Sequence, residues 1–374
     1  MKVEVERDAL MGAVRAVIDV VEARTTIPVL SNMLVEVEGG SLTLTGTDLD
    51  LQVSATVSAA GEMKTTVDAR KLQAAVDSLF KGKVSITPID GRSAVTLKAG
   101  RGQRILPTLS AADFPKRAAI ADARTFTIPG ADLSRILDTA SVAMSTEEVR
   151  FYLNGIYIHP WEGRLRGVAT DGHRLVRVEV DLPAGAEMAE GVILPRKAVG
   201  HLRKLLAKHD GQVEVETTSA AMAFQIGNVR VLTKLIEGTF PDYNRVIPDH
   251  AGRGFVGRPG VVAETISAVT AVTSPEGEKF KVRSVALATA ASPGESEARA
   301  KDQSGTSATE VLDVETIGEP IQFGVNRDYL KSAVALFREN GALTLDIRDP
   351  GAPMKLTGEH DDDLVAVVMP MRVG

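Results

Sequence analysis

The chain has 374 residues, 44% hydrophobic and 25% charged, an ordinary globular composition whose formal net charge of −6 argues on average against nucleic acid as a partner. It contains no cysteine, which excludes disulfides, thiol nucleophiles, thiolate zinc sites and iron–sulfur clusters. No apolar run reaches the roughly 18 to 20 residues of a membrane span, so we expect no membrane helix. The N-terminus alternates charged with apolar residues, so we expect no signal peptide and a cytoplasmic protein.

Six stretches carry apolar residues at the i, i+3, i+4, i+7 spacing of an amphipathic helix, each after a polar or proline-containing entry. In chain order they begin near Asp8, Asp68, Asp132, Pro195, Pro259 and Asn326. Strand-like runs lie between them, among them residues 41–57, 83–89, 163–180 and 342–347. The polar stretch 290–309 is predicted to be a loop or a weak edge region. The regular spacing of the helix starts indicates internal repeats.

A second marker gives the larger period of the repeat. An apolar strand followed by a Phe-Pro or Met-Pro step ends at Pro115, Pro241 and Pro370, which are spaced by 126 and 129 residues. We therefore predict an α+β fold with three homologous domains, each with two helices and antiparallel strands. The predicted domains span residues 1–122, 123–252 and 253–374.

Positive charge recurs in the second helical stretch of each predicted domain. Windows 68–83, 195–210 and 326–340 hold twelve Lys and Arg residues against five Asp and Glu. Basic pairs eleven residues apart occupy equivalent places in the three windows: Arg70 and Lys81, Lys197 and Lys208, Arg327 and Arg338. Eleven residues bring a helical side chain back to within about 20° of its starting direction, so each pair is predicted to share one helical face. In the second window Lys204 is predicted to add to the basic face formed by Lys197 and Lys208.

Two interpretations of these basic pairs remain open. Most Lys and Arg runs are solvated helix faces. Three equivalent pairs in an acidic chain instead favour a repeated surface for a phosphate backbone. No motif for reading bases is present, so such binding would be weak, independent of sequence and sensitive to salt.

Catalytic signatures are missing from the sequence. It contains no phosphate-binding loop, dinucleotide fingerprint, HExxH or GxSxG motif, and its six histidines lack metal-ligand spacing, so no catalytic site, metal or cofactor is expected. Asp171 and His173 would form a hydrolytic dyad only with a nucleophile, and none is apparent. Asp171-Gly172 is instead typical of a hairpin turn. The acidic run 361–363 is predicted to be a solvated turn.

Six motifs along the chain resemble those of the bacterial beta sliding clamp, the non-catalytic processivity subunit of DNA polymerase III. They are Arg24–Asn32, Thr47–Leu49, Tyr152–Gly155, Ala169–Leu175, Phe240–Pro248 and Val368–Arg372. The resemblance implies three domains per chain and a head-to-tail homodimeric ring that encircles DNA. It also implies one pocket per chain that accepts short peptides of partner proteins.

The resemblance assigns individual residues to these two surfaces. It implies DNA contacts for Arg24, Arg70, Lys71, Arg196, Lys197 and Arg203, to which the spacing adds Lys81, Lys204, Lys208, Arg327 and Arg338. It implies that the pocket is formed by Leu153, Thr170, Gly172, His173, Arg174, Leu175, Pro241, Arg245, Val246, Phe280, Asn326, Tyr329, Val367, Met369, Pro370, Met371 and Arg372.

The implied partners are encircled double-stranded DNA, a second copy of the chain, the polymerase III alpha subunit and the clamp loader delta subunit. Other DNA polymerases, mismatch-repair proteins and ligase are expected to bind through clamp-binding peptides. The protein would act in the cytoplasm, associated with the nucleoid, and no membrane partner is expected. Two alternatives stay open: a three-domain β-rich protein that binds peptides or another protein but not DNA, and a hydrolase that uses Asp171 and His173.

Overall fold

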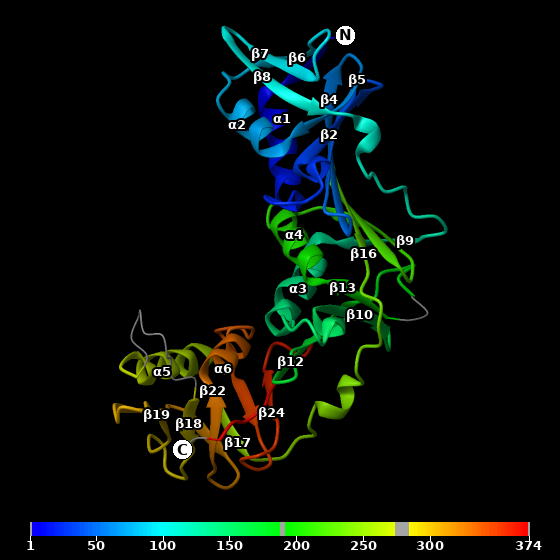
Figure 1. The fold of residues 1–374 in the computed structure, drawn as a ribbon. Helices are drawn as coiled ribbons and strands as arrows, with labels where there is room; N and C mark the ends of the chain where they lie inside the picture. Colours follow the sequence, from blue (N-terminus) through cyan, green and yellow to red (C-terminus); the bar gives the residue numbers. More distant parts are fainter. Residues whose placement is uncertain (1, 188–190, 274–283, 373–374) are drawn as a thin grey trace. The chain divides into compact units, whose positions relative to one another are not determined.

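The computed structural model describes residues 2–187, 191–273 and 284–372 (Figure 1). The chain divides into two compact units, one formed by Met1–Ser134 and Pro183–Ile236 and the other by Arg135–Leu182 and Glu237–Gly374. All six predicted helices are present: α1 (Arg7–Val17), α2 (Ala69–Asp77), α3 (Gly130–Ala140), α4 (Arg196–Leu206), α5 (Pro259–Ala271) and α6 (Arg327–Val334). None of the helices in these described ranges is long and apolar enough to cross a membrane.

An antiparallel sheet runs through the first unit in the order β1-β6-β7-β8-β5-β2-β3-β4-β16-β15-β14-β9. Its strands are β1 (Val3–Glu6), β2 (Asn32–Glu38), β3 (Ser41–Thr47), β4 (Leu51–Ala60), β5 (Met63–Asp68), β6 (Lys83–Pro88), β7 (Ala94–Ala99), β8 (Gly102–Leu109), β9 (Arg124–Pro129), β14 (Gln212–Thr217), β15 (Ala221–Ile226) and β16 (Val229–Lys234). The short strand β13 (Val192–Pro195) leads into α4. A Cβ atom at Gly46 of β3 would lie 2.8 Å from a methyl group of Val17, so glycine allows the end of α1 to approach the sheet closely.

The second unit holds two sheets. One includes the order β10-β11-β12-β25-β24-β23-β17-β21 and the other has the order β20-β19-β18-β22. The strands are β10 (Gly155–Trp161), β11 (Arg164–Thr170), β12 (Arg174–Asp181), β17 (Gly254–Gly257), β18 (Ser284–Ala288), β19 (Glu297–Lys301), β20 (Ser307–Val311), β21 (Glu315–Ile317), β22 (Gln322–Asn326), β23 (Leu343–Asp346), β24 (Met354–Gly358) and β25 (Leu364–Val368). The stretch predicted as a loop or weak edge contains β19 and most of β20, and β20 is the edge strand.

The same strand pairing joins successive repeats in each unit. In the first unit β4 pairs antiparallel with β16, and Gln52 lies opposite Leu232. In the second unit β12 pairs antiparallel with β25, and Leu175 lies opposite Val367. The internal repeat therefore extends to the antiparallel pairing of the strands that connect its copies.

The second helix of each repeat is shorter than its basic window, which overturns one prediction. α2 ends at Asp77, α4 at Leu206 and α6 at Val334, so the second basic residues, Lys81, Lys208 and Arg338, lie beyond the helices. In two repeats the chain turns so that an apolar side chain, Leu79 or Phe337, enters the core at 5% and 4% exposure. The prediction that each pair shares one helical face is therefore wrong.

The acidic run before β25 was also predicted wrongly. The Asp361 side chain is only 2% exposed, and its Oδ2 accepts the backbone N–H of Arg338 at 3.0 Å. Arg135 of α3 donates to both carboxylate oxygens of Asp363 at 2.5 and 2.7 Å. The hydrogen bond and charge of Asp363 raise the pKa of Arg135 despite its partial burial. This turn is an internal ion-pair site rather than a solvated loop.

Candidate functional site

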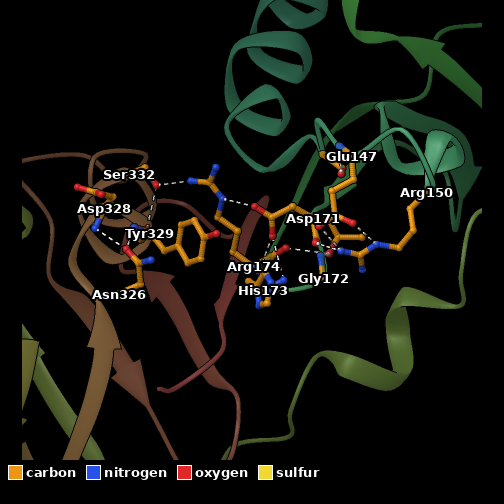
Figure 2. Close-up of polar contacts among 12 residues, drawn as sticks. Glu147, Arg150, Asp171, Gly172, His173, Arg174, Asn326, Asp328, Tyr329 and Ser332 are labelled. Carbon is orange, nitrogen blue, oxygen red and sulfur yellow. Dashed lines mark hydrogen bonds and ion pairs between the residues drawn. The ribbon is translucent and has the colours of Figure 1, made fainter. Parts of the chain in front are cut away.

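The turn between β11 and β12 has the hairpin role expected of Asp171-Gly172. The Thr170 hydroxyl donates to the Arg174 carbonyl at 2.8 Å and accepts the Gly172 N–H at 3.1 Å. Oδ1 of Asp171 accepts the N–H groups of His173 and Arg174 at 2.9 and 3.0 Å. These bonds fix the turn locally and leave the His173 side chain exposed (Figure 2).

The φ of +87° at position 172 favours glycine, and a guanidinium group lies close to it. A Cβ atom there would lie 2.5 Å from a terminal nitrogen of Arg150. Arg150 donates to the carboxylate of Glu147 at 2.9 and 2.8 Å and to the Asp171 carbonyl at 3.1 Å. The hydrogen bond with Arg150 lowers the pKa of Glu147, so the pair stays charged beside the turn. Sequence reasoning missed both residues, whose only local signal was an i, i+3 charge pair.

Arg174 connects the turn to α6. Its Nε donates to Oδ2 of Asp171 at 3.0 Å, and a terminal nitrogen donates to the Ser332 hydroxyl at 2.7 Å. The guanidinium carbon also lies 4.6 Å from the centroid of the Tyr329 ring, which is typical of a cation–π contact. The His173 ring lies 6.1 Å from the same ring and nearly parallel to it. Figure 2 shows this line of side chains from the turn to the helix.

The start of α6 and the C-terminal segment complete this cluster. The Asn326 side chain caps α6 by accepting the N–H groups of Asp328 and Tyr329 at 2.9 and 3.3 Å. After β25 the chain continues beside the turn, because the Met369 N–H donates to the His173 carbonyl at 2.8 Å. The Met371 N–H donates to the Gly324 carbonyl of β22 at 2.9 Å, and Pro370 forms a bridge with Val325.

Exposure divides the predicted pocket residues of this cluster into two groups. Leu175 and Val367 are buried at 2% and 3% exposure, and they serve as sheet core. Met369 and Met371 remain 38% and 37% exposed although their backbone is hydrogen-bonded. Arg372 is also exposed. The cluster therefore offers flexible apolar side chains with cationic and aromatic neighbours, which suits recognition of a short peptide.

The remaining predicted pocket residues are in the same unit. Leu153 is buried in a short helix, Phe151–Leu153. Tyr243 holds the segment that carries Pro241, Arg245 and Val246: its hydroxyl is 2.9 Å from Nε2 of His159 and accepts from Arg166 at 3.2 Å. The three carried residues are exposed, and among the described residues no hydrogen bond or ion pair joins them to the turn. Phe280 lies outside the described residues.

The contacts of Asp171 bear on the hydrolase alternative. Both of its carboxylate oxygens bond to the turn backbone and to Arg174, and neither bonds to the His173 ring. No group of three His, Cys, Asp or Glu side chains in the described part of the chain could hold a metal ion. In this arrangement Asp171 shapes the turn and holds Arg174.

The predicted DNA-facing cations differ in their surroundings. Lys197 pairs with the buried carboxylate of Asp48 and, at 3.4 Å, with Glu22, and Lys204 pairs with Asp19 at 2.7 Å. Burial alone would lower the pKa of Lys197, but the hydrogen bond and charge of Asp48 outweigh it and raise that pKa. These two lysines hold α4 against the first repeat.

Two cations of the third repeat are also engaged internally. The Arg327 side chain is only 13% exposed and lies 3.4 Å from Asp328, while Arg338 lies 3.3 Å from Asp361. The other predicted cations are exposed, and within the described ranges the following form no ion pair: Arg24, Arg70, Lys71, Lys81, Arg196 and Lys208. Arg203 is exposed and has an interaction partner.

Comparisons with known proteins place this architecture. Models of the DNA polymerase III beta subunit match residues 1–118 (N-terminal domain), 127–242 (central domain) and 244–372 (C-terminal domain). Beta sliding clamps of Caulobacter vibrioides and Escherichia coli K12 are 34% and 31% identical, with complete coverage of both chains. A solved DnaN sliding clamp of Bartonella birtlesii bound to griselimycin aligns over the full length of both chains, with 33% identity and a TM-score of 0.92.

The architecture is thus the three-domain α+β fold of DNA clamps, as predicted. The chain belongs to the bacterial beta sliding clamp family, whose members are non-catalytic processivity subunits of DNA polymerase III and bind DNA and polymerase. The predicted function, DNA replication as a polymerase clamp without chemistry of its own, is confirmed by this membership.

Proposed function

We propose that two copies of this chain close head to tail into a ring that encircles double-stranded DNA and tethers the replicative polymerase. One observation carries the proposal: among the described residues, β20 is unpaired along one side and β8 is unpaired along most of one side. β20 is the edge of its sheet, and β8 pairs with β5 only through Leu109 and Thr108. Open edges of this kind pair readily with another chain.

These two edges are the counterparts of the strands that already join the repeats. β4, β12 and β20 each follow a hairpin turn, after which Gln52, Leu175 and Ser307 lie opposite the last residue of the preceding strand. β8 and β16 correspond as well, because Pro107 and Lys234 lie opposite the first residues of the preceding strands, Ala94 and Ala221. A β20–β8 junction between chains would repeat β4–β16 and β12–β25, and a heterologous contact whose rotation closes gives a ring.

The first unit supplies the register proposed for the junction between subunits; in the second unit Val367, opposite Leu175, stands one residue rather than two before the end of its hairpin. Gln52 lies opposite Leu232 in the first unit, and Ile105 stands two residues before Pro107 as Leu232 stands two before Lys234. Ser307 is therefore expected opposite Ile105 of the partner subunit. Directly opposed residues have Cα atoms about 4.5 to 5.5 Å apart, which a disulfide can bridge.

The absence of cysteine makes this register testable by crosslinking. Under mild oxidation the double variant Ile105→Cys with Ser307→Cys should form a covalent dimer, seen on a non-reducing gel, while each single variant should not. The matched control is Ile105→Cys with Thr309→Cys, which moves one thiol two residues along the same face, beyond disulfide reach. Equal crosslinking of both double variants, or of neither, would contradict the proposed junction.

In the proposed ring, retention comes from encirclement, so the protein surface needs only weak contacts with phosphates. The exposed cations that form no ion pair among the described residues suit this role: Arg24, Arg70, Lys71, Lys81, Arg196 and Lys208. The domains would span residues 1–122, 123–252 and 253–374, and the ring would work on the chromosome in the cytoplasm. Tethering raises the effective concentration of the polymerase at the primer end.

The cluster around the Asp171 turn is proposed as the docking site for partner peptides. Its support is the combination of exposed Met369 and Met371 with His173, Arg174 and Tyr329. The site would accept the polymerase alpha subunit, the loader delta subunit, other polymerases and repair proteins in turn. A family clamp solved with griselimycin supports a ligand-binding site in this fold.

A further inference from the structure

Three turns at equivalent places begin with an aspartate. Asp48 stands between β3 and β4, Asp171 between β11 and β12, and Asp302 between β19 and β20. In each turn Oδ1 accepts two backbone N–H groups. For Asp48 the donors are two and three residues ahead, at 3.0 and 2.7 Å, and for Asp302 they are two and four residues ahead, at 2.9 and 2.8 Å. One carboxylate oxygen therefore shapes the turn in all three repeats.

The second carboxylate oxygen binds a cation in the two turns, Asp48 and Asp171, that lie at junctions between repeats of the same chain. Oδ2 of Asp48 pairs with Lys197, the second residue of α4. Oδ2 of Asp171 pairs with Arg174 at 3.0 Å, and Arg174 reaches Ser332 of α6. The second oxygen thus connects each turn to the second helix of the following repeat.

The charge at the second position of that helix decides where the cation comes from. α4 has Lys197 there and pairs with Asp48 directly. In α6 the predicted counterpart, Arg327, is the first residue, and the second is Asp328, which would repel Asp171. The turn there supplies its own cation, Arg174. The first junction therefore pairs an anionic turn with a cationic helix, and the second has a turn that carries both charges.

The third turn lacks a cation of its own. Residues 303–306 are Gln, Ser, Gly and Thr, and among the described residues Oδ2 of Asp302 has no hydrogen-bond or ion-pair partner. Hydrogen bonds from Ser304, and then from Thr306, lower the pKa of Asp302, so its carboxylate stays ionised at neutral pH. At the second position of α2 stands Arg70, which is exposed and without an ion pair in the described part of the chain.

We propose that Asp302 forms an ion pair with Arg70 of the partner subunit at the junction between subunits. The inference rests on the proposed ring, in which the turn before β20 lies beside β8 and α2 of the partner. It reassigns Arg70 from DNA contact to subunit contact. The nearly complete burial of Asp48, whose side chain is 4% exposed under Lys197, indicates how well such a turn is covered by the neighbouring helix.

A charge swap tests the pair. Dimer dissociation is measured by sedimentation and by dilution-driven subunit exchange for the wild type, Arg70→Glu, Asp302→Lys and the chain that carries both changes. Each single reversal places like charges at both junctions of the ring, so its dissociation constant should rise at least about tenfold. The combined variant restores an opposite-charge pair at both junctions and should return to within about threefold of the wild type.

The matched control replaces the neighbouring cation in α2 by combining Lys71→Glu with Asp302→Lys, and it should not restore the dimer. Single reversals without effect, or a combined variant as weak as the two single effects multiplied, would overturn the ion pair while leaving the ring intact. A wild-type protein that is monomeric at micromolar concentration would instead overturn the ring itself. Folding of each variant is confirmed by its thermal unfolding midpoint.

Discussion

A loss of partner-peptide affinity of about tenfold is expected when Met369 and Met371 are both replaced by alanine. Each side chain is more than one-third exposed, while its backbone N–H is held by a hydrogen bond that alanine retains. Fully burying an exposed methionine side chain contributes about 1.5 to 3 kcal/mol, so covering the exposed third of each side chain contributes about 0.5 to 1 kcal/mol, or roughly two- to fivefold per residue. The dissociation constant is measured by fluorescence anisotropy with a labelled peptide that carries the clamp-binding segment of the replicative polymerase.

The control for this variant is Leu49→Ala, which removes a comparably exposed apolar side chain from the equivalent turn of the first unit. It should leave peptide affinity within about twofold, because the turn around Asp48 is occupied by Lys197. Unchanged affinity in the double methionine variant would remove these residues from the docking site. Loss of the dimer in that variant would show that the C-terminal segment has a structural role instead.

A shallower salt dependence of DNA binding is expected for Lys71→Glu combined with Lys208→Glu. Both lysines are exposed and form no ion pair among the described residues, so they are available to phosphates. Each lost phosphate contact lowers the slope of log K against log salt by about 0.9, and the dimer carries two copies of each lysine. We expect the slope to fall by about two to four, measured by anisotropy with a short linear duplex, which a ring can thread from its ends.

Lys204→Met is the matched control for the charge reversal, because its ammonium group already pairs with Asp19. It removes a positive charge from the same region and should change the slope by less than about one. If the Lys71 and Lys208 reversals leave the slope unaltered, the exposed cations have no part in DNA contact. If Lys204→Met has the larger effect, the assignment by ion pairing is wrong.

The repeat and the helices could be predicted from sequence because both depend on local pattern. Apolar periodicity located all six helices, and the Asp-Gly pair located the turn between β11 and β12. The ends of the second helices were missed because tertiary packing decides them. Leu79 and Phe337 leave the helical path to enter the core, and periodicity alone gives no sign of this.

Charge partners were the other limit of the sequence. From the sequence Lys197 is predicted to be a free cation on a basic helical face, and only the fold brings it to Asp48 and Glu22. The acidic run before β25 likewise looks solvated until Arg135 of α3 lies beside it. The turn motif located the cluster that we propose binds peptides, but the contacts of Arg150 and Ser332 depend on residues far apart in the chain.

Encirclement of DNA is tested most directly by cutting the DNA. The protein is placed by its loader on a nicked circular plasmid, separated from free protein by gel filtration, and the plasmid is then linearised at one site. We expect the protein to stay on the circle, even at a salt concentration that abolishes binding to short duplexes, and to be lost within minutes of linearisation. Equal retention on circular and linear DNA would mean ordinary affinity binding and would contradict a ring around the duplex.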